Sequence, residues 1–110
     1  METSTQNINN LLKLFKIDLQ NLYHERLDKL ILFGSYSRNE AQENSDIDLL
    51  LVLNDKQISP YKEIDFTNDL VFSYMLNYEK QISIVPTTKQ QFEQQESPLL
   101  LNIRKDGINL

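Results

Sequence analysis

The sequence predicts an α/β domain of the α+β type, in which helices pack on one face of a short mixed β-sheet. Two long stretches with helical apolar spacing, 8–22 and 61–78, alternate with three short apolar runs, 30–33, 46–53 and 81–85. A chain of 110 residues with this alternation is the size of one domain with a single core. We therefore expect the whole chain, 1–110, to form one domain.

The N-terminal part of the chain predicts a helix followed by a buried strand. Residues 8–22 place apolar side chains at i, i+3, i+4 and i+7, the stripe of an amphipathic helix. After a polar break, 30–33 gives four consecutive apolar residues that Gly34 ends, which is typical of a strand buried on both faces. Segment 35–41 opens with Ser35, a good N-cap residue, and fits about two helical turns.

A central strand and a long helix follow the polar turn at 42–45. Residues 46–53 read D-I-D-L-L-L-V-L, which predicts a central strand with two acids at its start. Pro60 suits the first turn of a helix that continues over 61–78. That helix carries two apolar stripes, so it is either fully buried or holds a partner protein on the second stripe.

The C-terminal part predicts a third strand and two short helices. Residues 81–85 alternate in polarity and form a strand that Pro86 closes. Thr88 starts a short helix that reaches Phe92. The last helix has 99–105 as its body, Ser97 as N-cap, Pro98 at its first position and Gly107 as a left-handed terminator.

Composition excludes several classes of site. The chain has no cysteine, so zinc-thiolate sites, catalytic thiols and disulfides are excluded. Its two glycines, Gly34 and Gly107, lie too far apart for a dinucleotide-binding turn or a P-loop. The net charge of −5 argues against nucleic acid as a partner. The apolar run 49–53 is too short to span a membrane, and residues 1–10 lack the features of a signal peptide, so we expect a cytoplasmic protein.

Asp46 and Asp48 are the strongest candidates for metal ligands. Residues i and i+2 of a strand point to the same face, so the two carboxylates can reach the same ions. Oxygen ligands alone suit Mg²⁺ or Mn²⁺. Gly34 ends the preceding strand twelve residues earlier, and Ser35 opens a helix whose free amides favour an anion. If these strands are antiparallel neighbours, the geometry suits phosphoryl or nucleotidyl transfer.

The motif resembles the signature of the DNA polymerase beta-type nucleotidyltransferase superfamily. Gly34-Ser35, ten residues and Asp46-Ile47-Asp48 match the pattern Gly-Ser, ten residues, Asp-x-Asp without insertion or deletion, within a resemblance that spans about 30–86. The length is similar to that of its minimal nucleotidyltransferases, among them MntA-like antitoxins of HEPN/MNT toxin–antitoxin pairs. The resemblance implies a polymerase beta-like nucleotidyltransferase fold.

The resemblance also implies roles for particular residues. Gly34 and Ser35 would contact the triphosphate of an NTP, most simply ATP, and Asp46 and Asp48 would bind magnesium. A third carboxylate usually comes from a later strand, but Ser83 stands at that place here. Glu79 lies four residues earlier, roughly 13 Å along an extended strand, and is too far to replace it.

Three functional hypotheses follow. The first is metal-dependent transfer of AMP from ATP to an acceptor hydroxyl, held by a helical HEPN-type partner or a second copy of the chain in a homo-oligomer. The second is a catalytically degenerate module that neutralises its partner by occlusion, because Ser83 removes a ligand. The third is a free-standing transferase that acts on a small molecule or a nucleic acid end; the acidic charge argues against the nucleic acid.

Other residues have simpler interpretations beside the functional ones. Arg38 lies one turn beyond Ser35 and either reaches a phosphate or pairs with Glu40 or Glu43. His24, the single histidine, is expected to be a partly exposed residue after the first helix. Asn44, Asp46, Asp48 and Asp55 fit four positions of a calcium-binding loop, but Leu49 stands where that loop needs glycine. We expect Tyr61, Tyr74 and Tyr78 to be core or interface residues.

Overall fold

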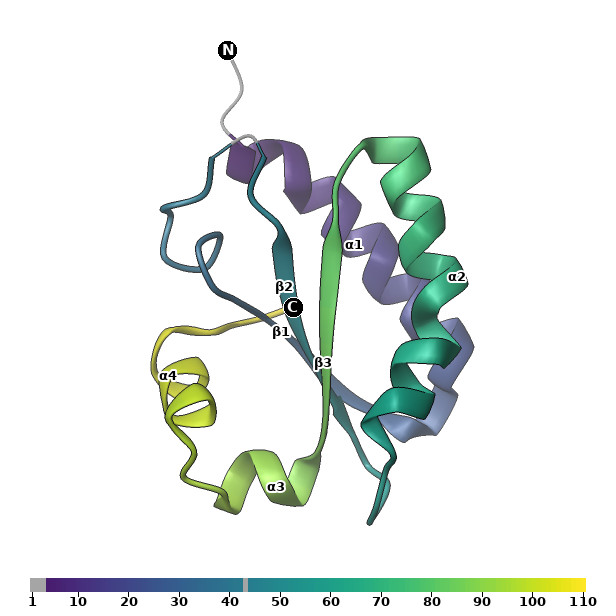
Figure 1. Cartoon of the computed structure of the whole chain (residues 1–110), viewed down its shortest axis with the longest axis vertical. Coiled ribbons are helices and arrows are strands. Elements are labelled where there is room, and N and C mark those ends of the chain that lie inside the picture. Colours follow the sequence, from purple (N-terminus) through teal and green to yellow (C-terminus); the bar gives the residue numbers. More distant parts are fainter. Residues whose placement is uncertain (1–3, 43) are drawn as a thin grey trace.

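The structure is a computed structural model that describes residues 4–42 and 44–110, and the side chains of 8–42 and 44–110. Its elements are helix α1, the 3₁₀ turn η1, strands β1 and β2, helix α2, strand β3, helices α3 and α4, and strand β4 (Figure 1). Their bounds are Ser4–Tyr23, His24–Arg26, Leu27–Phe33, Ile47–Leu53, Pro60–Tyr78, Ile82–Thr88, Lys89–Gln94, Pro98–Asp106 and Ile108–Asn109, in that order.

The four strands form one mixed sheet in the order β3-β2-β1-β4. Strand β2 runs antiparallel to β1 and parallel to β3, and β4 adds two antiparallel residues beside β1. The predicted mixed sheet with helices, and the antiparallel neighbours at its centre, are confirmed.

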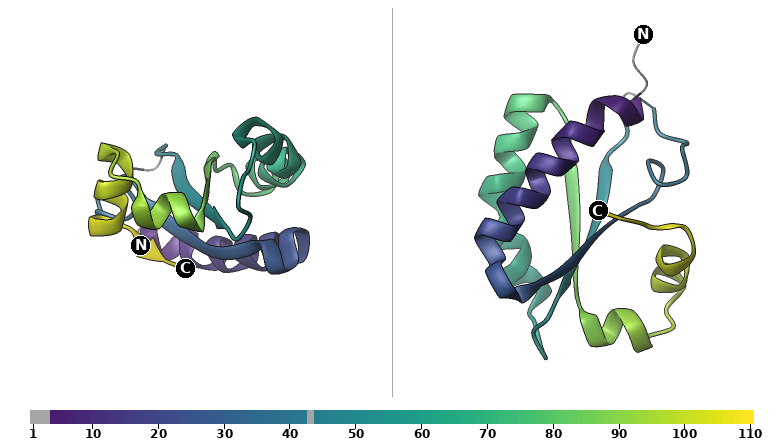
Figure 2. Two further views of the ribbon diagram at one scale, coloured as in Figure 1. Left: turned by 90° about the horizontal axis from the view of Figure 1, so that it is seen from below. Right: turned by 180° about the vertical axis from the view of Figure 1, so that it is seen from behind.

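The prediction that the helices pack on one face is wrong, because β2 is apolar on both faces. Leu49, Leu51 and Leu53 point to one face and join the buried stripe of α1, with Tyr74 of α2. Leu50 and Val52 point to the other face, where residues of α3 and α4 cover them. Figure 2 shows α1 lying across one side of the sheet. Each face therefore has its own apolar cluster.

The boundaries of β1 and β3 differ from the predictions. Strand β1 begins at Leu27, since that residue pairs with Leu53 across a register irregularity despite its polar neighbours. Strand β3 passes through Pro86 instead of ending before it. The amide of Ile47 donates to the carbonyl of Gln81, so the odd-numbered residues of β3 direct their backbone N–H and C=O groups toward β2. The nitrogen of Pro86 therefore faces the open edge of the sheet, where no amide donor is needed.

The C-terminal elements confirm the predicted helix starts but not the predicted terminator. The Thr88 side chain caps α3 in a capping box, and Ser97 accepts a bond from the amide of Leu100 at the start of α4. Gly107 has φ −69°, which is not left-handed. A side chain there would lie 2.5 Å from the Ile103 carbonyl oxygen and 2.6 Å from Ile31 Cγ2. Glycine is therefore required by the close approach of α4 to β1.

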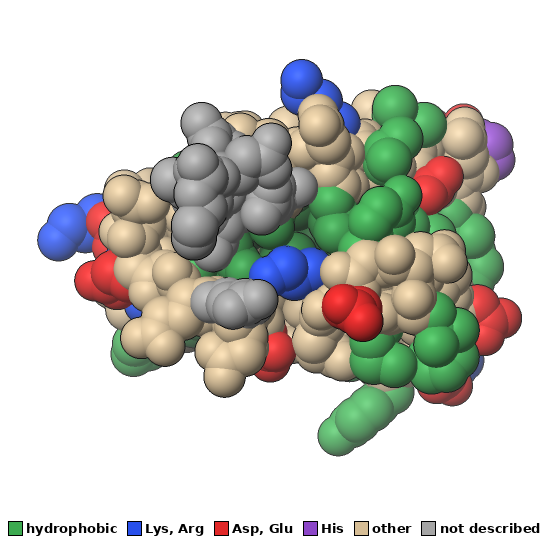
Figure 3. Space-filling view, turned by 90° about the horizontal axis from the view of Figure 1, so that it is seen from above, with side chains coloured by type: hydrophobic (Ala, Val, Ile, Leu, Met, Phe, Trp, Pro, Cys, Tyr) green, Lys and Arg blue, Asp and Glu red, His purple; other side chains and the backbone are tan. Residues whose placement is uncertain are grey.

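The long helix α2 is only partly buried. Tyr74 is 5% exposed and donates a hydrogen bond to Asp18 of α1 at 2.6 Å. Other apolar side chains of α2 are exposed, which rules out the fully buried alternative; they are Tyr61, Ile64, Phe66, Phe72, Leu76 and Tyr78. Figure 3 looks onto the end of the molecule where α2 finishes, with green hydrophobic side chains at its surface.

Candidate active site

The antiparallel pairing of β1 and β2 brings the two halves of the sequence motif together. Phe33, the last residue of β1, lies opposite Asp48, the second residue of β2. Gly34 follows Phe33 directly, so the turn that it opens begins beside the Asp48 carboxylate. Gly34 and Asp48, 14 positions apart in the sequence, are thereby brought into contact.

Gly34 and Asp48 approach each other so closely that a side chain at position 34 would displace the Asp48 carboxylate. A Cβ atom on Gly34 would lie 2.3 Å from Asp48 Oδ2 and 3.2 Å from its Cγ. Gly34 also has φ +76°, a left-handed conformation that residues with a side chain rarely adopt. The glycine thus serves both the backbone turn and the placement of the carboxylate.

The segment after Gly34 is a series of turns, so the prediction of a two-turn helix with Ser35 as its N-cap is wrong. The amide of Arg38 donates to the Gly34 carbonyl at 3.3 Å and that of Glu40 to the Ser35 carbonyl at 2.8 Å. Asn39 has φ +57°, so the helical conformation cannot continue through it. The left-handed residues Gly34 and Asn39 bound a segment of four residues, which is too short for a regular series of α-helical hydrogen bonds.

The turn can nevertheless accept an anion. The backbone amides of Ser35, Tyr36 and Ser37 donate no hydrogen bond to any of the described residues. Successive free amides in a turn form a concavity suited to phosphate oxygens. The buried ring of Tyr36 anchors this turn in the core, and its hydroxyl accepts a hydrogen bond from Lys80 at 3.3 Å.

Asp46 and Asp48 act on each other electrostatically. Asp46 is exposed just before β2, and Asp48 is half-buried. Burial raises the pKa of Asp48, the negative charge of Asp46 raises it further, and the Arg38 guanidinium lowers it. A carboxylate whose charge is disfavoured by burial and by a second carboxylate, with oxygen as the only ligand atom, fits a divalent cation such as Mg²⁺ or Mn²⁺.

Ser83 occupies the position beside Asp48 on the neighbouring strand. The parallel register pairs Asp48 with Ser83, so both side chains point to the same face of the sheet. Glu79 lies outside β3 as the C-cap of α2, although it lines an open cavity together with Asp46. Across the described part of the chain, no group of three acidic or histidine side chains could hold a metal ion.

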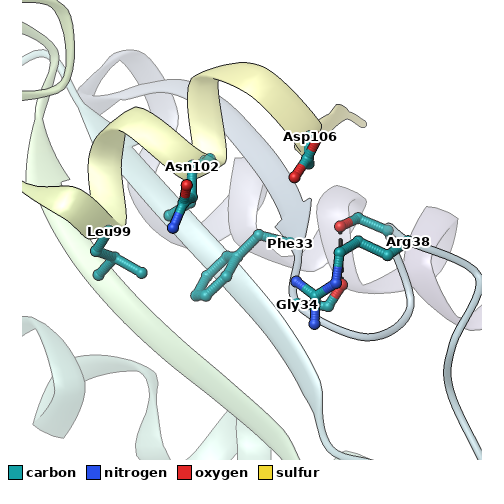
Figure 4. Close-up of a pocket in the computed structure, with 8 residues that line it drawn as sticks. Phe33, Gly34, Arg38, Leu99, Asn102 and Asp106 are labelled. Carbon is teal, nitrogen blue, oxygen red and sulfur yellow. Dashed lines mark hydrogen bonds between the residues drawn. The ribbon is translucent and has the colours of Figure 1, made fainter.

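Arg38 and α4 enclose a pocket next to the glycine turn (Figure 4). Arg38 is exposed and pairs with Glu40 at 2.8 Å, one of the two partners predicted for it; the other, Glu43, lies outside the described residues. The pocket has a volume of about 110 Å³ and is lined by Phe33, Gly34, Ser37, Arg38, Leu99, Asn102, Ile103 and Asp106. Sequence reasoning missed the α4 residues, although Leu99, Asn102 and Asp106 have the spacing of one helix face.

The remaining sequence candidates lie outside this site. His24 is exposed in η1, as expected. Leu49 to Leu53 form a fully buried strand, which excludes a calcium-binding loop at this place. Within residues 4–42 and 44–110, no helix is both long and apolar enough to cross a membrane.

The sequence is similar to a known protein family and to proteins of known sequence. A family model described as "Polymerase beta, Nucleotidyltransferase" matches residues 6–110. Two proteins of Methanocaldococcus jannaschii, both provisionally named protein adenylyltransferases, are 36% identical over 73 residues and 33% identical over 81 residues. These alignments cover 66% and 74% of this chain, and 72% and 74% of the two relatives.

Solved structures share the fold at low sequence identity. A provisionally named nucleotidyltransferase from Sulfolobus solfataricus matches with a TM-score of 0.66 at 18% identity, covering 99% of this chain and 87% of that one. A toxin–antitoxin structure with AMP-PNP matches with a TM-score of 0.61 at 19% identity, over 97% and 72%. A complex of a tri-AMPylated Shewanella oneidensis HEPN toxin with its MNT antitoxin gives 0.54 at 19% identity, over 97% and 71%.

Proposed function

Because the chain belongs to the polymerase beta nucleotidyltransferase family, we propose that it transfers AMP from ATP to an acceptor hydroxyl with the help of Mg²⁺ or Mn²⁺. The observation that carries this proposal is the contact of Gly34 with the Asp48 carboxylate. It joins a turn with free amides to a pair of acids, the two parts that nucleotidyl transfer requires.

Each residue of the site has a separate task in this proposal. The amides of Ser35 to Ser37 bind the terminal phosphates, and Gly34 leaves room for them beside the acids. Asp46 and Asp48 hold the divalent cation, which supplies Lewis-acid stabilisation of the phosphate charge when it is bound. The Arg38 guanidinium, whose charge lowers the pKa of Asp48, adds a positive charge at the exposed side of the phosphates.

The transfer exchanges a phosphoanhydride bond of ATP for a phosphoester bond to the acceptor. The acceptor oxygen forms a bond to the α-phosphorus of ATP, and the bond from that phosphorus to the bridging oxygen of pyrophosphate breaks. Pyrophosphate leaves with its electron pair, and the acceptor's proton passes to water. The residues of the site contribute positioning and charge stabilisation, which supply most of catalysis in such reactions.

We further propose that the acceptor is a hydroxyl of a partner protein, and that the partner is a helical HEPN-type toxin. The names of the relatives as protein adenylyltransferases support a protein acceptor. The neighbour bound to an AMPylated HEPN toxin supports the type of partner. The exposed apolar side chains of α2, such as Phe72 and Leu76, provide a surface on which a protein can dock.

Label transfer from ATP tests this function. The protein is incubated with Mg²⁺, a HEPN partner and ATP labelled at either the α- or the γ-phosphate. We expect α-label on the partner and none from γ-labelled ATP. Asp46→Asn should abolish transfer, whereas Glu93→Gln, which changes an exposed acid on α3, should leave it unchanged.

The same experiment separates the enzyme from the occlusion module. Ser83 beside Asp48 favours the module, because a metal held by Asp46 and Asp48 would lack a third carboxylate from the described residues. If the wild-type protein binds and inhibits its partner but transfers no label, and Asp46→Asn inhibits equally well, the occlusion module is correct. Transfer of label to a small molecule without any partner would instead favour the free-standing transferase.

A further inference from the structure

One side of the pocket between the glycine turn and α4 is formed by a face of α4 whose side chains change from charged to apolar along the helix. Leu99, Asn102 and Asp106 follow each other at i, i+3 and i+7, so all three lie on one face of α4 and line the pocket. Figure 4 shows Asp106 nearest to Gly34 and Arg38, with Asn102 and Leu99 progressively farther away. With increasing distance from the glycine turn, α4 therefore presents a carboxylate, an amide and an apolar side chain.

We infer that the nucleoside of the donor nucleotide lies against α4 with its base seated in this pocket, whose volume of about 110 Å³ is smaller than a whole nucleoside, and that Asn102 selects adenine. The inference rests on the proposed function, because it requires the phosphates to lie at Gly34. The three α4 residues span about 10.5 Å along the helix axis, comparable with the length of a nucleoside. A nucleotide whose phosphates occupy the turn can therefore lay its ribose and base along α4 in that order.

Phe33 forms the floor of the pocket. It is half-buried, contacts the apolar cluster under α4 and lies opposite Asp48 in the sheet register. Phe33 directly precedes Gly34, so its ring is held next to the glycine turn. An aromatic ring fixed beside a phosphate site is a stacking surface for a base, and such stacking tolerates any base.

Asn102 and Asp106 provide the polar recognition. The exposed side-chain amide of Asn102 makes no hydrogen bond with the described residues, so both its donor and its acceptor are available. Asparagine pairs in a bidentate manner with the amino group and ring nitrogen of adenine. The Asp106 carboxylate faces the charge of Arg38 and can accept bonds from ribose hydroxyls, as acidic residues do in other nucleotide sites.

Binding measurements by calorimetry in the presence of Mg²⁺ test the inference, with ATP, GTP, 2′,3′-dideoxy-ATP and inorganic tripolyphosphate as probes. The wild-type protein should prefer ATP to GTP. Asn102→Leu should weaken ATP binding about 10-fold or more and remove the preference over GTP, while tripolyphosphate binds as before. Asp106→Ala should reduce the preference for ATP over the dideoxy analogue.

Two leucines of α4 give a matched control. Leu99 and Leu101 are 45% and 47% exposed, but only Leu99 lines the pocket. Leu99→Ala should weaken ATP binding, and Leu101→Ala should not. A wild-type preference for ATP that persists in Asn102→Leu would overturn the inference and leave the proposed function intact. Failure of the wild-type protein to bind either ATP or tripolyphosphate would overturn both.

Discussion

Replacing Gly34 by alanine tests the geometry of the site most simply. The added Cβ would lie 2.3 Å from Asp48 Oδ2, and an ordinary carbon–oxygen contact needs roughly 1 Å more. The carboxylate must therefore retreat by about 1 Å, a displacement that can lower a reaction rate about 100-fold. The left-handed φ of +76° adds a strain of about 1–2 kcal/mol.

The Gly34→Ala variant should therefore lose activity far out of proportion to its loss of stability. We expect about 1–2 kcal/mol less stability in urea unfolding and transfer reduced about 100-fold or more. Tyr23→Phe serves as the control, because it removes a buried hydrogen bond to Glu63, 3.0 Å long, at a comparable cost of about 1–2 kcal/mol. If both variants kept the same transfer rate, the close contact at Gly34 would have no catalytic importance.

Three further predictions concern Asp48's neighbour on β3 and the polar network at the opposite end of β2. Ser83→Asp should place a third carboxylate beside Asp48, so Mg²⁺ should bind more tightly and transfer should accelerate about 10-fold, as measured by Mg²⁺ titration of the labelling rate. Arg26→Ala should cost about 2 kcal/mol in urea unfolding, because Arg26 pairs with the buried Glu63 at 2.8 Å, yet leave transfer unchanged. Burial and the Glu63 carboxylate raise the pKa of Tyr23, so its contribution to stability is complete below about pH 10 and declines above it; Tyr23→Phe should flatten the fall of the melting temperature in that alkaline range.

Hydrophobic patterning and motif spacing predicted the parts of the fold that depend on local sequence. The long helices and the three main strands follow directly from apolar periodicity, and the capping residues Thr88 and Ser97 mark helix starts correctly. The motif spacing also led to the antiparallel neighbours that bring Gly34 to Asp48. The helices, strands and caps need only short-range information, since each residue's role is set by residues near it in the chain, whereas the strand pairing followed from requiring both halves of the motif to share one site.

The errors arose where tertiary contacts decide the conformation. Two left-handed residues, Gly34 and Asn39, replace the expected helix with turns that carry the free amides. Pro86 is tolerated because its nitrogen lies on the open edge of the sheet. Asn102 and Asp106 resemble ordinary surface residues of a short helix, and only the packing of α4 beside the glycine turn places them at the site.

A crystal structure with a non-hydrolysable ATP analogue and manganese would show most directly whether the turn at Gly34 and the two aspartates form the active site. We expect anomalous manganese density at Asp46 and Asp48, the triphosphate on the amides that follow Gly34, and a water or carboxylate of the partner near Ser83. An analogue bound elsewhere, with no manganese at the two aspartates, would contradict the assignment of the active site.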